Sequence, residues 1–152
     1  MFRVFVAATA ALVLNGCVIS VNDTDDDAPR YRNVYSSGNA GKPYSDAVAA
    51  DDFVFLSGVL GTSPSTGELA AGGIGPETLQ AMQNMSRALA DFDLTPDDVV
   101  KCTVFLADMD EWAAMNDVYT TFFRNPPARS AVEVSRLGLD ARVEIECIAY
   151  ND

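Results

Sequence analysis

From residue 76 to residue 149 the spacing of apolar side chains alternates between a helical period and a strand period. Pro76 suits the first turn of a helix, where the missing N–H has no partner to lose. Residues 99–106 read as a strand, 110–123 as a second helix, and 130–135 and 142–149 as two closing strands. Steps of three or four residues, the spacing of one helix face, separate the apolar side chains after Pro76: Leu79, Met82, Met85, Leu89 and Phe92.

The residues before Pro76 add three strand patterns. Residues 31–36 form the first, and residues 47–50 and 53–57, joined through Asp51-Asp52, read as a hairpin. The order β-β-β-α-β-α-β-β predicts an α+β fold with both helices on one face of a single mixed sheet. We expect the second helix and the last strand to contribute the following inner side chains: Trp112, Met115, Tyr119 and Phe122, and Ala141, Val143, Ile145 and Cys147.

Composition narrows the possible chemistry. The chain has 152 residues, enough for one domain with its own core, and a formal net charge of −12. Because the sequence contains no histidine, a histidine general base and a histidine-containing metal site are both excluded. The acidic balance and the lack of a Lys/Arg cluster argue against nucleic acid as a partner. No spacing of residues indicates a metal or a cofactor, and we expect neither.

Residues 1–16 have the features of a signal peptide. Arg3 precedes an apolar run over residues 4–14, which is too short to span a membrane as a helix. The run ends at Leu14-Asn15-Gly16-Cys17, which is similar to a bacterial lipobox and predicts Cys17 as a lipidated first residue. Ordinary export and an apolar N-terminal strand are the alternatives.

Residues 17–30 are polar and acidic, which favours a flexible tether between the lipidated Cys17 and a folded domain over residues 31–152. A calcium loop is a poorer interpretation, because the acidic run lacks the glycine and closing glutamate of an EF-hand. We therefore expect an exported lipoprotein that faces the bacterial periplasm and meets the membrane only through its lipid.

Cys102 and Cys147 each lie in an apolar strand pattern, without a CxxC or a metal-ligand spacing. Two free, buried cysteines, which behave as small apolar residues, are the favoured interpretation. An oxidising periplasm would also permit a disulfide, provided that the Cα atoms lie within about 7 Å. The sequence does not provide that distance.

Arg129 is the leading candidate for binding a ligand. It lies where the loop of Pro126 and Pro127 enters a strand, and its planar guanidinium can grip a carboxylate with two parallel hydrogen bonds. An ion pair with Glu133 or Glu146 is the alternative. Glu144 and Glu146 share one face of the last strand, where a partly buried carboxylate suits proton transfer.

Six short motifs follow one another along the chain: Gly41-Lys42-Pro43-Tyr44-Ser45, Phe55-Leu56-Ser57-Gly58, Val104-Phe105-Leu106, Met115-Asn116-Asp117-Val118-Tyr119, Pro127-Ala128-Arg129-Ser130 and Val143-Glu144-Ile145-Glu146. Together, and in this order, they resemble the RidA (YjgF/YER057c/UK114) family of reactive-intermediate imine deaminases over residues 31–149. The resemblance implies a chorismate-mutase-like fold and a homotrimer with sites between subunits. It also implies cofactor-free hydrolysis of 2-imino and 2-enamino acids to 2-keto acids and ammonia, an activity of the 2-iminobutanoate/2-iminopropanoate deaminase type.

The resemblance also implies roles for individual residues. Arg129 would hold the substrate carboxylate, Glu146 would orient or activate water, and the Tyr44 hydroxyl would reach the pocket. Packing, solvent exposure or a strand-ending turn are the alternatives for these and the remaining positions. Further substrate contacts are expected from a strand end, a helix and the strand after Arg129: Ser57, Gly58, Asn116, Tyr119 and Ala131.

Two departures leave other functions open. Ala131 stands where many family members have cysteine, so only backbone groups can serve there. An exported copy would also be separated from the enamines that cytoplasmic pyridoxal-phosphate enzymes release. A lipoprotein that binds carboxylate ligands without turnover, and an interaction protein with holdase-like behaviour, are therefore the competing hypotheses.

Overall fold

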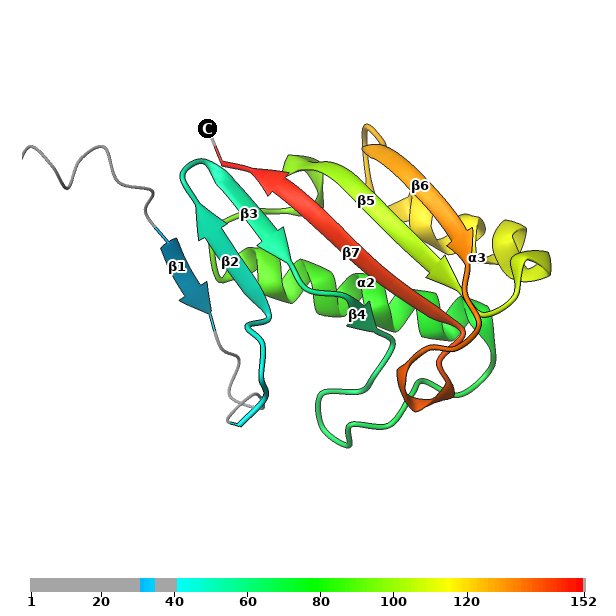
Figure 1. Cartoon of the computed structure of the whole chain (residues 1–152). Helices are drawn as coiled ribbons and strands as arrows, with labels where there is room; N and C mark the ends of the chain where they lie inside the picture. Colours follow the sequence, from blue (N-terminus) through cyan, green and yellow to red (C-terminus); the bar gives the residue numbers. More distant parts are fainter. Residues whose placement is uncertain (1–30, 35–40, 152) are drawn as a thin grey trace, which may run out of the picture. The chain divides into compact units, whose positions relative to one another are not determined.

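The computed structural model describes residues 31–34 and 41–151. Within them the expected α+β order is confirmed, with one short additional strand (Figure 1). The strands are β1 (Tyr31–Val34), β2 (Ala47–Ala50), β3 (Phe53–Leu56), β4 (Val59–Leu60), β5 (Val99–Leu106), β6 (Ala128–Glu133) and β7 (Val143–Tyr150). The helices are α2 (Ile74–Ala90) and α3 (Trp112–Tyr119), with 3-10 turns η1 (Pro96–Asp98), η2 (Met109–Glu111), η3 (Thr120–Phe122) and η4 (Gly138–Asp140).

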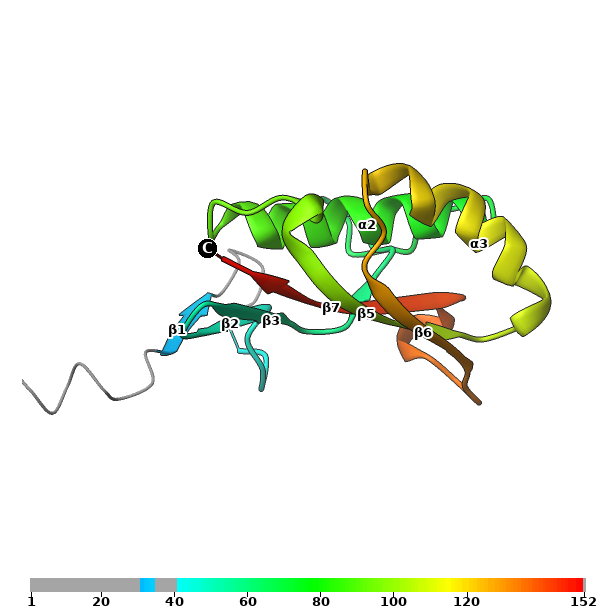
Figure 2. The same cartoon turned by 90° about the horizontal axis from the view of Figure 1, so that it is seen from above.

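The strands form one mixed sheet in the order β1-β2-β3-β7-β5-β6, with β4 paired to the other end of β7. Only β5 and β6 run parallel among the described pairs, and α3 connects them. Figure 2 shows α2 and α3 on the same side of the sheet, as the sequence predicts. The opposite side of the sheet carries no helix among the described residues, and we call it the open face.

Alternation along the two central strands separates the core from the open face. In β7 Val143, Ile145 and Cys147 are buried beneath the helices, whereas Glu144 and Glu146 point the other way. This confirms the predicted inner face of the last strand, which also includes the buried Ala141. The same alternation in β5 buries its even-numbered positions from 102 to 106. Side chains of β5 and β7 therefore present two surfaces with different chemistry.

Helix α2 packs a slightly different stripe from the predicted one. It starts at Ile74, and Pro76 lies in its first turn, where backbone N–H groups have no intrahelical partner. Met82, Met85 and Leu89 are fully buried as expected, but Leu79 is 43% exposed. Thr78 is buried in its place, because the residues of α2 that are buried are those that face the sheet, whether or not they are apolar.

Two further details differ from the sequence expectations. β4 was not predicted, because two residues are too few to show a period. The second helix is shorter than residues 110–123, since 3-10 turns occupy both of its ends. Trp112, expected in the core, is 44% exposed, and Phe122 is only half-buried. Both lie near an end of the helical segment, where fewer residues pack against the core.

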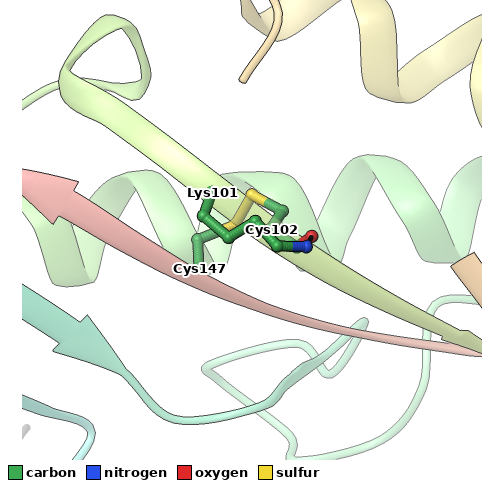
Figure 3. Close-up of a disulfide and its surroundings, with 3 residues drawn as sticks. All are labelled: Lys101, Cys102 and Cys147. Carbon is green, nitrogen blue, oxygen red and sulfur yellow. Dashed lines mark hydrogen bonds between the residues drawn. A yellow bond between two sulfur atoms is a disulfide. The ribbon is translucent and has the colours of Figure 1, made fainter. Parts of the chain in front are cut away.

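A disulfide joins Cys102 of β5 to Cys147 of β7, and the favoured interpretation of two free thiols is therefore wrong (Figure 3). The two residues are directly opposite in the antiparallel register, with Cα atoms 4.1 Å apart. Both are buried on the helix side of the sheet. Only the pairing of strands that lie 45 residues apart brings them together.

The predicted signal peptide, the lipidated Cys17 and the acidic tether lie outside the described residues. Among the residues that are described, no helix has the length and hydropathy to cross a bilayer.

Candidate functional site

Arg129 lies near the start of β6 and points toward α3. Its guanidinium carbon is 4.6 Å from the centre of the Tyr119 ring and 5.9 Å from that of Trp112. No carboxylate in the described part of the chain forms a salt bridge with Arg129. Glu133 instead accepts a hydrogen bond from the Met109 backbone N–H at 3.1 Å. The two rings orient the cation and leave its hydrogen-bond donors available to an anion.

Polar atoms beside this arginine lack partners. The Tyr119 hydroxyl and the Asn116 Oδ1 are buried and make no hydrogen bond within the described residues. The spacing of Trp112, Asn116 and Tyr119 places all three on one side of α3. Burial raises the pKa of Tyr119, and the Arg129 guanidinium opposes that rise through its positive charge and as a donor facing the hydroxyl. Since buried polar atoms are normally paired, a ligand or ordered water would complete this cluster.

Glu144 forms a second cluster on the open face. Its carboxylate lies so close to Gly58 that a Cβ on Gly58 would be 1.9 Å from Oε1 of Glu144. Glycine is therefore needed at residue 58 for this side chain to lie there. Burial, and secondly the charge of Glu146, raise the pKa of Glu144. Glu146, the carboxylate that the resemblance put first, is exposed and lies beside Lys101 and Thr103.

Ser57 and Tyr44 lie in the segments that lead into this second cluster. The Ser57 hydroxyl donates to the Ser45 carbonyl at 2.7 Å, and its N–H donates to the Asp46 carbonyl at 2.9 Å. Both Ser57 donors thus hold the loop before β2, leaving only acceptor capacity on the hydroxyl. Tyr44 is 50% exposed, with the Lys42 ammonium 5.5 Å from its ring centre.

Within one chain the two clusters lie on opposite faces of the sheet. Arg129 is paired with Cys102 in the parallel register, so it shares the helix side, as does Ala131 beside Val104. Glu144 is paired with Phe105 on the open face. One copy of the chain therefore does not bring Arg129 and Glu144 together.

Residues 35–151 match the family model described as Endoribonuclease L-PSP. A RutC family protein of Pyrococcus horikoshii is 42% identical over 125 residues, which cover 80% of this chain and 99% of that protein. The chain belongs to the RidA/YjgF family. Human 2-iminobutanoate/2-iminopropanoate deaminase is 43% identical over 110 residues, or 70% of this chain and 79% of the human protein.

Solved structures of RidA/YjgF members confirm the fold. Yeast Mmf1 superposes with a TM-score of 0.76 at 35% identity and covers 81% of this chain and 100% of its own. The structure of E. coli TdcF with bound serine gives a TM-score of 0.70 at 33% identity, over 80% of this chain and 94% of TdcF. The mixed sheet with two helices on one face is therefore the fold of the family.

Two features of the RidA-like site were not anticipated from the sequence. Trp112 was assigned to the core, yet its ring lies near the Arg129 guanidinium. Trp112 lies four residues before Asn116, and residues at this spacing lie on the same helix face. That spacing could have indicated that Trp112 belongs to the site. The resemblance assigns the water-activating role to Glu146, whereas the structure distinguishes Glu144. Alternation along the strand puts both carboxylates on one face, and only the contact with Gly58 separates them.

Proposed function

We propose that this protein hydrolyses 2-imino and 2-enamino acids to 2-keto acids and ammonia without a cofactor. The observation that carries the proposal is the identity of 43% with human 2-iminobutanoate/2-iminopropanoate deaminase over 110 residues. The site supports it, because such a hydrolysis needs a cation for the substrate carboxylate and a carboxylate that can transfer protons. Arg129, which has no salt bridge within the described residues, lies on one face, and the partly buried Glu144 lies on the other.

Arg129 binds the substrate carboxylate through two parallel hydrogen bonds. Tyr119 and Trp112 keep the guanidinium in place without neutralising it, so the substrate is its anionic partner. The buried Tyr119 hydroxyl, and the buried Oδ1 of Asn116 on the same side of α3, can hydrogen-bond the rest of the ligand. One relative of this chain, E. coli TdcF, has a solved structure with bound serine, a small amino acid.

Glu144 is the general base and acid that transfers protons during water addition. It takes a proton from water as the water oxygen bonds to the imine carbon, and it passes that proton to the nitrogen to give a carbinolamine. It then takes the proton of the new hydroxyl and passes it to the nitrogen as the carbon–nitrogen bond breaks. The products are ammonia and a 2-keto acid whose keto oxygen derives from water. A raised pKa suits this exchange because it brings the carboxyl closer to neutral pH. Gly58 provides the space that this side chain occupies.

The complete site combines two copies of the chain, arranged as a homotrimer. Arg129 and Glu144 lie on opposite faces of one sheet, so each site takes one residue from each of two neighbours. The open face is suited to burial between copies, since exposed apolar patches mark interaction surfaces. Its large, exposed apolar side chains are Phe53, Phe55, Val132 and Tyr150.

The description of the matched family model names an endoribonuclease. We do not extend that activity to this chain. A formal net charge of −12 opposes binding to a phosphate backbone, and the absence of histidine removes the usual general base for RNA cleavage.

The proposal includes export and a lipid anchor at Cys17. The lipobox-like sequence before Cys17 supports this, and so does the buried Cys102–Cys147 disulfide, because such cross-links persist in oxidising compartments. Mass spectrometry of the protein from bacterial membranes would measure an acylated residue 17, with Cys17→Ser as the control. An unprocessed chain in the cytosolic fraction would exclude this part of the proposal.

The test is ammonia release by the purified protein from 2-iminopropionate generated in the assay. We expect acceleration over the background that Arg129→Ala abolishes. Arg136→Ala, which removes an exposed arginine beyond β6, should retain it. A folded protein that binds the ligand without releasing ammonia would replace the hydrolase with a carboxylate-binding lipoprotein. Holdase-like activity that is indifferent to Arg129→Ala would instead favour an interaction protein.

A further inference from the structure

Glu77 is a buried carboxylate for which the proposed reaction has no use. It lies in the first turn of α2 and is only 4% exposed. Its Oε1 accepts hydrogen bonds from the backbone N–H groups of Arg142 at 2.6 Å and of Val143 at 3.3 Å. Burying a carboxylate is costly unless its hydrogen bonds are made. These two bonds attach α2 to the residues that immediately precede Glu144.

Glu77 also contacts the strand on the other side of Glu144. A Cβ on Gly61 would lie 2.3 Å from the carbonyl oxygen of Glu77 and 2.6 Å from its Cγ. Gly61 therefore permits a close approach between α2 and the end of β4. The residue before it, Leu60, is the antiparallel partner of Glu144. The backbone on both sides of Glu144 thus rests against one residue of α2.

We propose that Glu77 is a positioning residue that keeps the Glu144 carboxylate packed against Gly58. It acts through the backbone of β7 and β4 and touches no substrate. The inference rests on the proposed function, in which Glu144 transfers protons during water addition. It identifies α2, through Glu77, as the element that positions the Glu144 carboxylate. A 1 Å displacement of a reacting group can cost on the order of a hundredfold in rate, so such a support matters for turnover.

A nearby ion pair provides a matched control. Arg142 donates to Glu111 Oε1 at 2.5 Å, and this contact holds the Arg142 side chain and not the backbone N–H groups. Both side chains are partly exposed, so the pair is expected to contribute little. Glu111→Gln therefore alters a charge beside the same residue while leaving the two bonds to Glu77 in place.

The test compares two substitutions that separate geometry from charge. Glu77→Asp keeps the charge but shortens the side chain, so it cannot reach both N–H groups. Glu77→Gln removes the charge but keeps an acceptor oxygen at the same reach. We expect turnover to fall roughly ten- to hundredfold in Glu77→Asp with little change in KM. Glu77→Gln and Glu111→Gln should stay near the wild type. Equal losses in Glu77→Asp and Glu77→Gln would overturn the proposal.

Glu144→Gln shows whether the effect passes through Glu144. If Glu77 acts by placing Glu144, Glu77→Asp should cost no further turnover in the Glu144→Gln background. The same loss in both backgrounds would show a general structural role and overturn the proposal. Should Glu77→Asp fail to fold, Gly61→Ala presses on the same contact from β4 and should show the same pattern.

A readout without activity keeps this inference separate from the proposed function. If the wild type releases no ammonia, the hydrolase proposal fails, and NMR titration of the Glu144 carboxyl decides the role of Glu77. We expect the pKa of Glu144 to fall in Glu77→Asp, because the carboxyl leaves its half-buried position, and to stay raised in Glu77→Gln. An unchanged pKa in Glu77→Asp would overturn the positioning role.

Discussion

Among the residues that the structure describes, aromatic faces hold Arg129 and no counter-ion does. Its guanidinium carbon lies 4.6 Å from the Tyr119 ring centre and 5.9 Å from that of Trp112. Contacts of this kind contribute roughly 0.5–2 kcal/mol each, enough to orient the side chain. A carboxylate partner would have oriented it too, but would have occupied the donors. The arrangement therefore favours a guanidinium that is available to bind an anion from outside the chain.

Tyr119→Phe tests whether the unpaired hydroxyl serves the ligand. Removing a buried hydroxyl that makes no hydrogen bond within the described residues should leave the unfolding free energy unchanged or raise it, by up to roughly 1 kcal/mol. If the hydroxyl contacts substrate, KM should nevertheless rise severalfold. Denaturant unfolding and ammonia-release kinetics measure the two effects. A clear loss of stability would show that the hydroxyl already has a structural partner.

Glu146→Gln tests the electrostatic link between the two carboxylates. The charge of Glu146 is the second cause, after burial, of the raised pKa of Glu144. Removing it should lower the pKa of Glu144, so that Glu144 ionises at lower pH. Since the ionised form accepts the proton, the acid limb of the kcat/KM profile should move to lower pH. An unmoved limb would mean that another group titrates there.

At the scale of elements, β5 and β7 are central strands of the sheet, and β7 also carries Glu144 of the candidate site. Their buried positions are joined by the Cys102–Cys147 disulfide, and their open positions present Phe105 beside Glu144. Cys102 is also paired with Arg129 of β6. The cross-link therefore ties together the strands on which the two clusters depend.

Reduction of the disulfide should destabilise the fold without moving the site. A cross-link that closes a loop of 45 residues stabilises by roughly 3–5 kcal/mol through the entropy of the unfolded chain. Guanidinium unfolding of the oxidised protein should thus have a higher midpoint than that of the Cys102→Ala/Cys147→Ala variant. Turnover per folded molecule should be similar. Coincident unfolding curves would contradict the predicted contribution.

At the scale of the whole molecule, the sheet separates Arg129 from Glu144. The helix side is filled by α2 and α3. The open face exposes large apolar side chains that include Phe53, Phe55, Val132 and Tyr150. A second copy on that face would cover these side chains and could bring its own arginine cluster to Glu144. Assembly would then complete the site as well as the core.

Mixed assemblies test this arrangement directly. Arg129→Ala and Glu144→Gln should each be inactive alone. When the two are co-expressed in a trimer with sites between neighbours, random assortment leaves roughly a quarter of the sites with both residues intact. We expect ammonia release to recover to about that fraction of the wild type. No recovery in demonstrated mixed trimers would place both residues of a site in one chain.

Local patterns in the sequence account for much of the fold. The buried Met82, Met85 and Leu89 follow helical spacing, and the buried positions of β7 follow strand spacing. Leu79 was misplaced because helical spacing allows a stripe of some width, and its edge depends on what the helix meets. The ends of α3 were misplaced for a similar reason, since 3-10 turns share the local pattern of a helix.

The sequence by itself determined the order of the elements, the inner side chains of β7 and the place of Arg129 at the entry to a strand. These follow from periods and turn residues, which act over a few neighbouring positions. Only the tertiary structure decided that Cys102 faces Cys147, that Glu144 lies on Gly58 and that Arg129 lies on the other side of the sheet. Each depends on the register between strands distant in sequence, and a shift of one residue would turn every side chain to the opposite face.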